Sequence, residues 1–350
     1  MMTKPMVSII ILNYNGKKWL EQCLPTWREV VYPNVEVIVV NNGSSDDSGD
    51  FVKRTFPEVS FLDVQPNIGF AGGNNYGVRH AAGKYIMLLN NDTKVTPGLL
   101  DSIVELMERD SSIGVIQPEM RNMVNPDRHD AVASYYTWTG FLYHYGYMQP
   151  IWKTQYQKSL YAYSIKGSGM IMRTKEYLEL GGLDEDFVCY VEESDLCHRF
   201  WLSGKKVLYH PKGLMYHYGG GDMSIMEKGE DTVFRSFRNR YVSYIKNLSF
   251  FELLKVLPIH TLFAQGYVLT FLFKGKFKEA LAANWGIFWW IFHLPSILKK
   301  RKYVQSKIRK VSDADIFKYF KRDPSFSYFK HFLLTPLNPF DEKEISEAVL

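Results

Sequence analysis

Apolar and polar positions alternate in short blocks along the first 110 residues of the chain. Apolar runs that are too short for a helix predict buried strands, and stretches with helical spacing lie between them. The predicted strands are Val7–Leu12, Val35–Val40, Val59–Val64 and a run from Lys84 that ends at Asp92, and the predicted helices are Lys17–Val30, Ser48–Phe56, Gly73–Ala82 and Leu99–Arg109. This alternation predicts βαβ units and an α/β fold, with a mostly parallel central sheet flanked by helices.

Each predicted strand runs into a polar loop at its carboxyl end. The loops are Asn13-Tyr14-Asn15-Gly16, Asn41-Asn42-Gly43-Ser44, Asn67-Ile68-Gly69-Phe70 and Asn90-Asn91-Asp92. One such loop is ordinary turn chemistry, but the carboxyl ends of parallel strands share one edge of the sheet, and ligands bind at that edge. Four such loops in succession therefore predict a polar binding pocket.

Composition narrows the class of protein. With 350 residues, 46% of them hydrophobic and 23% charged, the chain predicts an ordered globular protein of one large or two smaller domains. The three cysteines have no metal-type spacing, which indicates a reducing compartment without structural disulfides. The glycines at 69, 72 and 73 follow the third predicted strand rather than the first and do not match G-x-G-x-x-G, so a dinucleotide-dependent dehydrogenase is excluded.

Asp92 ends the fourth apolar run and lies just before Thr96-Pro97-Gly98. A carboxylate flanked by amides at a sheet edge suits a hard divalent cation that carries a phosphate. The alternative is that Asp92 caps the helix that begins near Pro97. His217 is a lone histidine, which is usually a buried hydrogen-bonding residue, and it becomes a candidate metal ligand through its pairing with Asp92.

Three carboxylates gather further along the chain. Glu192, Glu193 and Asp195 lie at the N-terminus of a predicted helix that Gly204 ends. The helix dipole favours ionised carboxylates there, whereas mutual repulsion in a closed cleft raises the pKa of one of them. Both effects are compatible with an anionic base, and the alternative role is helix capping.

Residues 110–165 are aromatic-rich and show few helix signals. Aromatic rings stack on the apolar faces of sugars, so this segment is expected to line an acceptor cleft, with ordinary packing as the alternative for each residue. The aromatic residues concerned are Tyr135, Tyr136, Trp138, Tyr143, Tyr145, Tyr147, Trp152, Tyr156, Tyr161 and Tyr163.

Seven motifs occur in a fixed order along residues 7–245. They are Val7–Gly16, Val39–Asp46, Asn67–Asn75, Leu88–Thr93, Gly181–Phe187, Glu192–Arg199 and His217–Gly219. In this order they resemble the family 2 inverting glycosyltransferases with a GT-A fold, and within them the rhamnosyltransferase-type branch that builds bacterial surface polysaccharides. The resemblance implies a nucleotide-diphospho-sugar transferase domain over residues 1–245.

The resemblance also assigns roles to individual residues. It implies a divalent cation, Mg²⁺ or Mn²⁺, and a dTDP- or UDP-sugar as donor. Asp92 and His217 would hold the cation, and Glu193 would be the catalytic base, with Glu192 and Asp195 as less favoured holders of that role. The residues that would bind the donor are Leu12, Tyr14, Asn41, Asn67, Gly69, Asn91, Asp92 and Gly167.

Two positions depart from the pattern of the family. The family usually has aspartate where Asn41 stands, in contact with the pyrimidine N–H, and an amide oxygen accepts the same bond more weakly than a carboxylate. The acidic pair is commonly Glu-Asp, whereas this chain has Glu192-Glu193.

The C-terminal third, residues 246–350, has two uncharged stretches, Val256–Phe273 and Ala280–Leu298, each near the length of a membrane span. The basic loop between them opposes a spanning hairpin, because the catalytic part must face the cytoplasm. Helices lying in the membrane interface are therefore expected, anchored by Trp285, Trp289, Trp290 and the basic run Lys299–Lys302. A re-entrant or spanning hairpin, an ordinary helical subdomain and a contact between copies remain the alternatives.

Together these features predict a metal-dependent inverting hexosyltransferase that moves rhamnose or a related hexose to a lipid-linked glycan or other saccharide acceptor. The expected location is the cytoplasmic face of the plasma (inner) membrane, with peripheral or monotopic attachment, and a homo-oligomer is left open. The alternative is a catalytically inactive nucleotide-sugar-binding or scaffold protein of the same pathway. A nucleic-acid partner is not expected, because no recognised binding fold accompanies the basic run.

Overall fold

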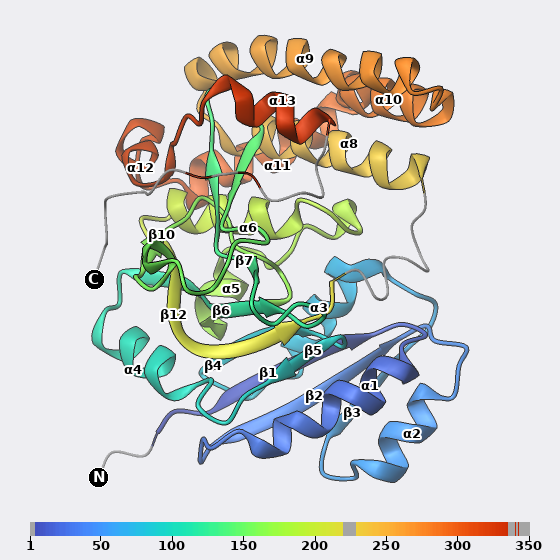
Figure 1. The fold of residues 1–350 in the computed structure, drawn as a ribbon, viewed down its shortest axis with the longest axis vertical. Coiled ribbons are helices and arrows are strands. Elements are labelled where there is room, and N and C mark those ends of the chain that lie inside the picture. The colour runs from blue at the N-terminus through green and yellow to red at the C-terminus, as the bar shows by residue number, and fades with distance from the viewer. Residues whose placement is uncertain (1–3, 220–228, 335–339, 341, 343–350) are drawn as a thin grey trace.

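The computed structural model describes residues 4–219, 229–334, 340 and 342. Its N-terminal part confirms the predicted alternation of strands and helices (Figure 1). The strands of this part are β1 (Val7–Asn13), β2 (Val35–Asn42), β3 (Ser60–Val64) and β4 (Tyr85–Asn90), and the helices are α1 (Lys17–Cys23), α2 (Ser48–Thr55), α3 (Gly69–Arg79) and α4 (Asp101–Arg109). Two helices differ from the prediction: the first gives way to a 3-10 turn at Leu24, where a proline follows, and α3 begins four residues before Gly73.

The central sheet is mixed: the predicted parallel direction holds for β12, β6, β4, β1, β2 and β3, whereas β10 and β11 run antiparallel to them. Its order is β10-β12-β6-β11-β4-β1-β2-β3, and β11 lies antiparallel between β4 and β6. No helix carries the chain back across the sheet between β6 and β11, so β11 enters from the edge where β6 ends and runs in the opposite direction. The further strands are β5 (Thr93–Val95), β6 (Ile113–Asn122), β7 (His129–Ala131), β8 (Ala133–Tyr136), β9 (Leu142–Tyr145), β10 (Leu160–Tyr161), β11 (Gly169–Arg173) and β12 (Lys206–His217).

The two faces of the sheet bury different hydrophobic clusters. Successive residues of a strand point to opposite faces, and on β1 this places Ile9 and Ile11 in one cluster and Ile10 and Leu12 in the other. The first cluster packs against α4, and the second continues toward the C-terminal helices. Because both faces are covered, ligands reach this sheet at its edges and strand ends.

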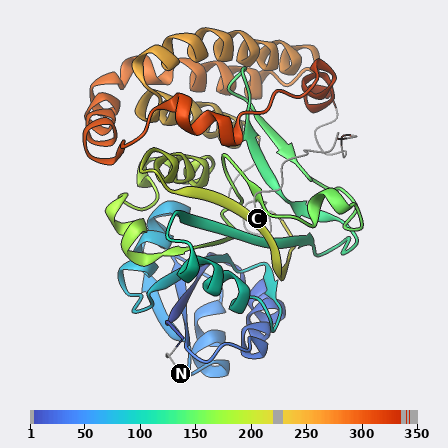
Figure 2. The ribbon, with the colours of Figure 1, turned by 90° about the vertical axis from the view of Figure 1, so that its left-hand side faces the viewer.

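The C-terminal helices form a layer on the side of the molecule away from β3 (Figures 1 and 2). Within this layer α10 crosses α8 closely at Gly286, where an added Cβ would lie 2.7 Å from the carbonyl oxygen of Phe234. The helices of the second half are α5 (Thr174–Glu179), α6 (Glu192–Leu202), α8 (Glu230–Asn247), α9 (Phe250–Phe273), α10 (Phe277–Phe292), α11 (Leu294–Tyr303), α12 (Asp313–Phe320) and α13 (Phe326–Leu334). The predicted domain boundary at residue 245 falls inside α8 and stays a prediction.

The aromatic segment packs inside the protein. The hairpin β8–β9 rises from the sheet to the helical layer (Figure 2), and its Phe141 ring stacks on Tyr267 of α9. The expectation that this segment lines an acceptor cleft is wrong for the tyrosines at 135, 136, 143, 145, 156 and 163, each at most 6% exposed. Tyrosine is as apolar over its ring as phenylalanine, so the composition of the segment could not separate the two roles. Trp138 and Trp152 remain exposed.

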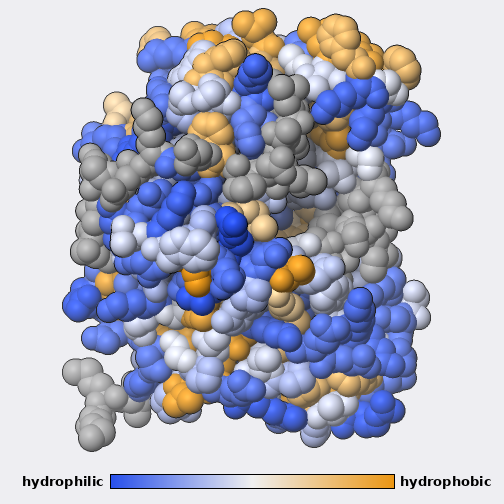
Figure 3. All heavy atoms as spheres, viewed as in Figure 1, coloured by the Kyte–Doolittle hydropathy of each residue, from blue (hydrophilic) through white to orange (hydrophobic). Residues whose placement is uncertain are grey.

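Helix α9 presents a large apolar surface to solvent. It is long and apolar enough to cross a membrane, and 17% of its most apolar window is buried in the protein. α10 together with the segment Leu294–Ile308 passes the same test as a pair, but the two are bent by 70° at His293. Apolar atoms gather over α9 at the top of the molecule (Figure 3). Exposed side chains of this region include Phe250, Phe251, Leu254, Leu262, Leu269, Phe273, Phe277 and Leu281.

Candidate active site

Polar side chains at the carboxyl ends of β4, β1, β2 and β3 form one hydrogen-bonded row. Asn91 Nδ2 donates to Asn13 Oδ1 at 2.8 Å, Asn13 Nδ2 donates to Asn41 Oδ1 at 3.3 Å, and Asn41 Nδ2 donates to Asp63 Oδ1 at 2.9 Å. We call these four residues the amide row. The three asparagines are at most 6% exposed, whereas Asp63 is exposed. Asn41 and Asn91, predicted to bind the donor, thus belong to one network at the expected edge of the sheet.

The third loop is held against the same edge. Asn42 donates to the carbonyl of Gly69 at 3.0 Å, and the amide of Gly69 donates to Asn67 at 2.8 Å. Gly69 has a positive φ of 78°, and an added Cβ would lie 2.9 Å from Val188. The site therefore requires glycine at residue 69. Because α3 begins at Gly69, the N–H groups of its first turn lie beside Asn67 and are suited to an anion.

Leu12 and Tyr14 lie on either side of Asn13 at the end of β1. The Leu12 side chain is 8% exposed and packs under α3, where an added Cβ on Gly73 would lie 2.4 Å from it. Only the backbone of Leu12 can therefore face a donor. Tyr14 is half-buried, so its ring remains accessible at the edge.

Asp92 and His217 meet, as their proposed joint role requires. His217 at the end of β12 lies with Nε2 3.3 Å from Asp92 Oδ1 and with Nδ1 3.0 Å from Asp130 Oδ2. Burial opposes charge on this imidazole, but hydrogen bonds to Asp130 and Asp92 raise the pKa of His217 above its ordinary value. Lys166 extends this series of contacts, with its Nζ 2.6 Å from Asp130 Oδ2.

The donor set at Asp92 and His217 fits a divalent cation. Two neighbouring ligands of an octahedral cation, each about 2.1 Å from the metal, lie about 3 Å apart, close to the 3.3 Å between Asp92 Oδ1 and His217 Nε2. Asp130 holds the other ring nitrogen of His217 and so fixes the orientation of the ring. Over the described residues, no three His, Cys, Asp or Glu side chains converge as a metal site. Phosphate oxygens of a donor would therefore have to complete the coordination.

The acidic helix begins after a strained segment. Val188, Tyr190 and Val191 have φ between 63° and 71°, and α6 then starts at Glu192. Strained backbone of this kind persists where the surrounding structure holds it, and it directs the first turn of α6. Gly167 lies against this turn, since an added Cβ would be 3.6 Å from Glu193 Cβ.

Glu193 and Glu192 differ in surroundings. Glu193 is half-buried, and burial raises its pKa, which makes its carboxylate a stronger base. Glu192 is 6% exposed, and burial together with the charge of Glu193 raises its pKa well above the ordinary value, which favours the protonated form. Lys166 lies close enough to Glu193 to oppose the rise in its pKa, so one lysine links the acidic helix to the Asp130–His217 pair.

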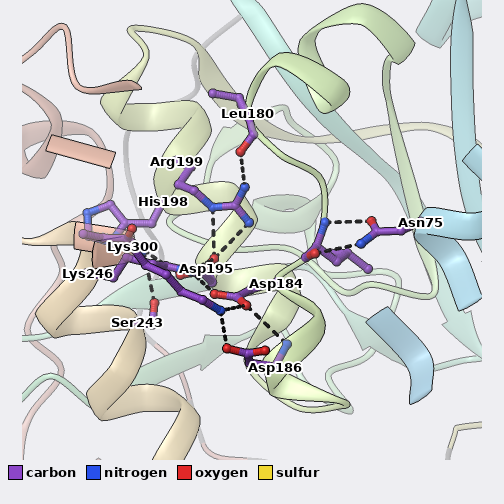
Figure 4. Close-up of polar contacts among 12 residues, drawn as sticks. Asn75, Leu180, Asp184, Asp186, Asp195, His198, Arg199, Ser243, Lys246 and Lys300 are labelled. Atoms are coloured by element: carbon purple, nitrogen blue, oxygen red, sulfur yellow. Dashed lines mark hydrogen bonds and ion pairs between the residues drawn. The ribbon is translucent and has the colours of Figure 1, made fainter. Parts of the chain in front are cut away.

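Asp195 is part of a buried ion-pair network (Figure 4). It is fully buried, and its oxygens accept from Arg199 at 3.0 Å, Lys246 at 2.8 Å and Asn247 at 2.8 Å. Burial opposes its charge, but Lys246 and Arg199 lower its pKa below the ordinary value. A carboxylate with these partners is a weak base, which favours Glu193 over Asp195 as the catalytic group.

The basic run at Lys299–Lys302 is partly used inside the protein. Lys300 pairs with Asp184 and lies 2.6 Å from Asp186, and Arg301 donates to backbone carbonyls at the end of α8. The predicted anchoring of the chain to a membrane by this run therefore rests on Lys299 and Lys302, which are exposed.

A cavity of about 610 Å³ lies between α11 and the loop at Gly181–Asp186, and its lining includes neither Asp92, His217 nor Glu193.

Three residues of this site carry no recognisable signal in the sequence pattern. Asp63, Asp130 and Lys166 act through partners that are distant in the chain, and each belongs to a residue type that is common on surfaces. The spacing of the motifs gave no signal for Asp130, because it lies on the three-residue strand β7.

The sequence of this chain is similar to those of known glycosyltransferases. Residues 8–179 match the family model described as Glycosyl transferase family 2. An uncharacterized glycosyltransferase of Haemophilus influenzae is 21% identical over 254 residues, which cover 69% of this chain and 75% of that protein. The poly-beta-1,6-N-acetyl-D-glucosamine synthase of Staphylococcus epidermidis is 26% identical over 33% of this chain and 29% of its own length.

Solved structures share the fold. S. aureus TarS 1-349 in complex with UDP-GlcNAc superposes with a TM-score of 0.55 at 15% identity and covers 93% of this chain and 91% of its own. The mannosyltransferase PcManGT of Pyrobaculum calidifontis, in complex with GDP-Man and Mn²⁺, gives 0.51 at 16% identity over 82% and 88%.

The mixed sheet flanked by helices is a GT-A fold, which the chain shares with these solved structures. Over residues 8–179 the chain is similar to the glycosyltransferases of family 2.

Proposed function

We propose that the protein is a metal-dependent inverting glycosyltransferase that transfers rhamnose or a related hexose from a dTDP- or UDP-sugar to a lipid-linked glycan of the cell surface. The observation that carries the proposal is the contact between Asp92 and His217, 3.3 Å apart, which Asp130 and Lys166 connect to the acidic helix of Glu193. Relatives and fold neighbours named for Mn²⁺, for nucleotide sugars and for a polysaccharide synthase support it.

The roles of the residues follow from the chemistry of an inverting transfer. The acceptor hydroxyl attacks the anomeric carbon while the nucleoside diphosphate leaves from the opposite face, so a base must take the hydroxyl proton. Glu193 is that base, since its pKa is raised and it is accessible, whereas Asp195 is bound by cations. Asp92 and His217 would hold the divalent cation, which, when bound, neutralises charge on the leaving phosphates.

The donor base would lie at the strand ends beside Tyr14 and Asn41. There the asparagine oxygen stands where the family usually has a carboxylate. The first turn of α3 at Gly69 and Asn67 would face the phosphates with its amide groups.

A donor screen tests the proposal. Thermal unfolding of the wild-type protein with UDP-, dTDP- and GDP-sugars, each with and without Mn²⁺, should show one donor that raises the midpoint only when Mn²⁺ is present, because a bound ligand stabilises the fold. Asp92→Ala should abolish the Mn²⁺-dependent part. The donor so found is then offered with a panel of lipid-linked acceptors, and donor binding without transfer to any of them would indicate the inactive scaffold instead.

We further propose that the helical layer attaches to the cytoplasmic face of the plasma membrane in a peripheral or monotopic manner. The turn between α9 and α10 supports this placement, because it exposes Phe273 and Phe277 together with Lys274, Lys276 and Lys278. Exposed aromatic and basic side chains on one turn suit an anionic headgroup region.

A further inference from the structure

The amide row has one direction along its whole length. Each asparagine turns its nitrogen toward β3, Asn13 and Asn41 turn their oxygens toward β4, and the row ends on the carboxylate of Asp63. The strand register places Asn13 opposite Asn41, and Asn41 opposite Asp63, so the side chains are neighbours on one face of the sheet. Each amide has a donor nitrogen and an acceptor oxygen, so all the amides of the row could also be reversed together. The group at the end of the row decides which of the two directions is adopted.

Asp63 fixes that direction. An ionised carboxylate accepts hydrogen bonds and donates none, so Asn41 must turn its nitrogen to Asp63 and its oxygen to Asn13. The reversed amide would bring two oxygens together. Asn13 Nδ2 in turn donates to Asn41 at 3.3 Å and to Ser48 Oγ at 2.9 Å, and Asn13 Oδ1 accepts from Asn91 at 2.8 Å, so the next two amides follow the same direction.

We propose that Asp63 is a positioning residue that decides which face of the Asn41 amide meets the donor base, and thereby which pyrimidine the site accepts. This inference rests on the proposed function. An asparagine at residue 41 could present either an acceptor oxygen or a donor nitrogen, an ambiguity that the carboxylate usual in the family does not have. Asp63 lies at the exposed end of the row and accepts from the Asn41 nitrogen, so only the Asn41 oxygen is left to accept a hydrogen bond from the base.

The chemical consequence concerns ring position 3 of the pyrimidine. Asn41 Oδ1 has two lone pairs and takes a long bond of 3.3 Å from Asn13, so it can accept a second hydrogen bond. Uracil and thymine carry an N–H at position 3, whereas cytosine has a bare acceptor nitrogen there. With the oxygen presented, the site favours uracil or thymine; with the nitrogen presented, it would favour cytosine.

The burial of the row makes the orientation effective and testable. Asn13 and Asn41 are 1% and 6% exposed, so water competes little for their hydrogen bonds. Asp63 is exposed, so a substitution there changes the end of the row without opening the core.

Calorimetric titration with UDP and CDP, each with Mn²⁺, tests the inference, because the two nucleotides differ at the relevant ring edge. The wild-type protein should prefer UDP. Asp63→Asn allows both directions and should reduce the UDP-to-CDP affinity ratio about tenfold, the effect of one hydrogen bond. Asp63→Lys supplies only donors, so it should reverse the amide and make CDP the preferred nucleotide, while Asp63→Glu should keep the wild-type preference.

Asp50→Lys is the matched control, since it makes the same charge change at an exposed position on α2. It should leave the ratio unchanged. If both Asp63→Asn and Asp63→Lys fold and keep the wild-type ratio, the inference is overturned while the proposed function stands. If the wild-type protein binds neither nucleotide with Mn²⁺, the proposed function is wrong and the inference with it.

Discussion

Lys246 is a buried cation that joins the acidic helix to the C-terminal layer, and replacing it with methionine should be strongly destabilising. Its side chain is 4% exposed, and Nζ lies 2.6 Å from Asp184 and 2.8 Å from Asp195. Methionine fills a similar volume but leaves two buried carboxylates short of a cation. Removing one partner of a buried pair costs about 3–5 kcal/mol. The lower end applies here, because Asp195 keeps Arg199 and Asp184 keeps Lys300.

The effect should depend on pH. Burial would raise the pKa of Asp184 and Asp195, but Lys246 is the largest influence that lowers both below their ordinary values. A carboxylate with a lowered pKa stabilises the fold above its unfolded-state pKa, near 4, and this contribution is lost as the pH falls. The difference in unfolding free energy between wild type and Lys246→Met should therefore be full at pH 7, stay close to that value down to about pH 4, and shrink as the pH falls below 4.

Urea-induced unfolding followed by tryptophan fluorescence measures this difference. Lys175→Met is the control, since Lys175 is 86% exposed and its contact with Glu179 is 3.8 Å, so it should change stability little. The double variant Lys246→Met/Asp195→Asn should recover part of the loss, because one unpaired charge is removed. A loss below about 1 kcal/mol at pH 7, the size of an exposed pair, would refute the reasoning.

Two further predictions concern the donor loop and the helical layer. Gly69→Ala should destabilise the fold by about 1–3 kcal/mol and weaken donor binding, because φ is positive at this residue and Val188 blocks the added methyl group. Gly98→Ala is the control, since there is open space around Gly98. Equal midpoints of the two variants in thermal unfolding would contradict the prediction. Phe273→Ser/Phe277→Ser should weaken flotation with anionic vesicles at least about tenfold while leaving the unfolding midpoint unchanged. Val124→Ser is the exposed control far along the chain, and unchanged flotation of the double variant would argue against membrane attachment.

The sequence was sufficient for the strands that carry continuous apolar runs. Val7–Leu12 and Val37–Val40 are buried on both faces, and such strands have few alternatives once turn residues bound them. The strand β6 escaped because Gln117, Pro118 and Glu119 interrupt its pattern, although the strand is largely buried. The glycine-opened apolar run Lys166–Arg173 does predict the strand β11, but its antiparallel direction depends on the strand order, which the pattern does not specify.

The residues of the candidate site also fall into two groups, those marked by a local sequence pattern and those defined by a distant contact. Asp92 and Glu193 follow local patterns, a strand end and a helix start, and could be named from the sequence. Asp130 and Asp63 could not be named in this way, because Asp130 contacts His217, which lies 87 residues further along the chain, and Asp63 contacts Asn41, which lies 22 residues before it. Such contacts depend on strand order, which a single sequence does not specify.

Turnover of Glu193→Gln at saturating donor tests the central claim most directly. The account predicts that this variant binds the donor with Mn²⁺ as the wild type does but loses about 10²–10⁴-fold in kcat, the contribution of a general base. The Glu192→Gln variant should lose much less, because burial and the charge of Glu193 raise the pKa of Glu192 well above its ordinary value and favour the neutral form that glutamine mimics. A folded Glu193→Gln protein that transfers sugar at the wild-type rate would contradict the account.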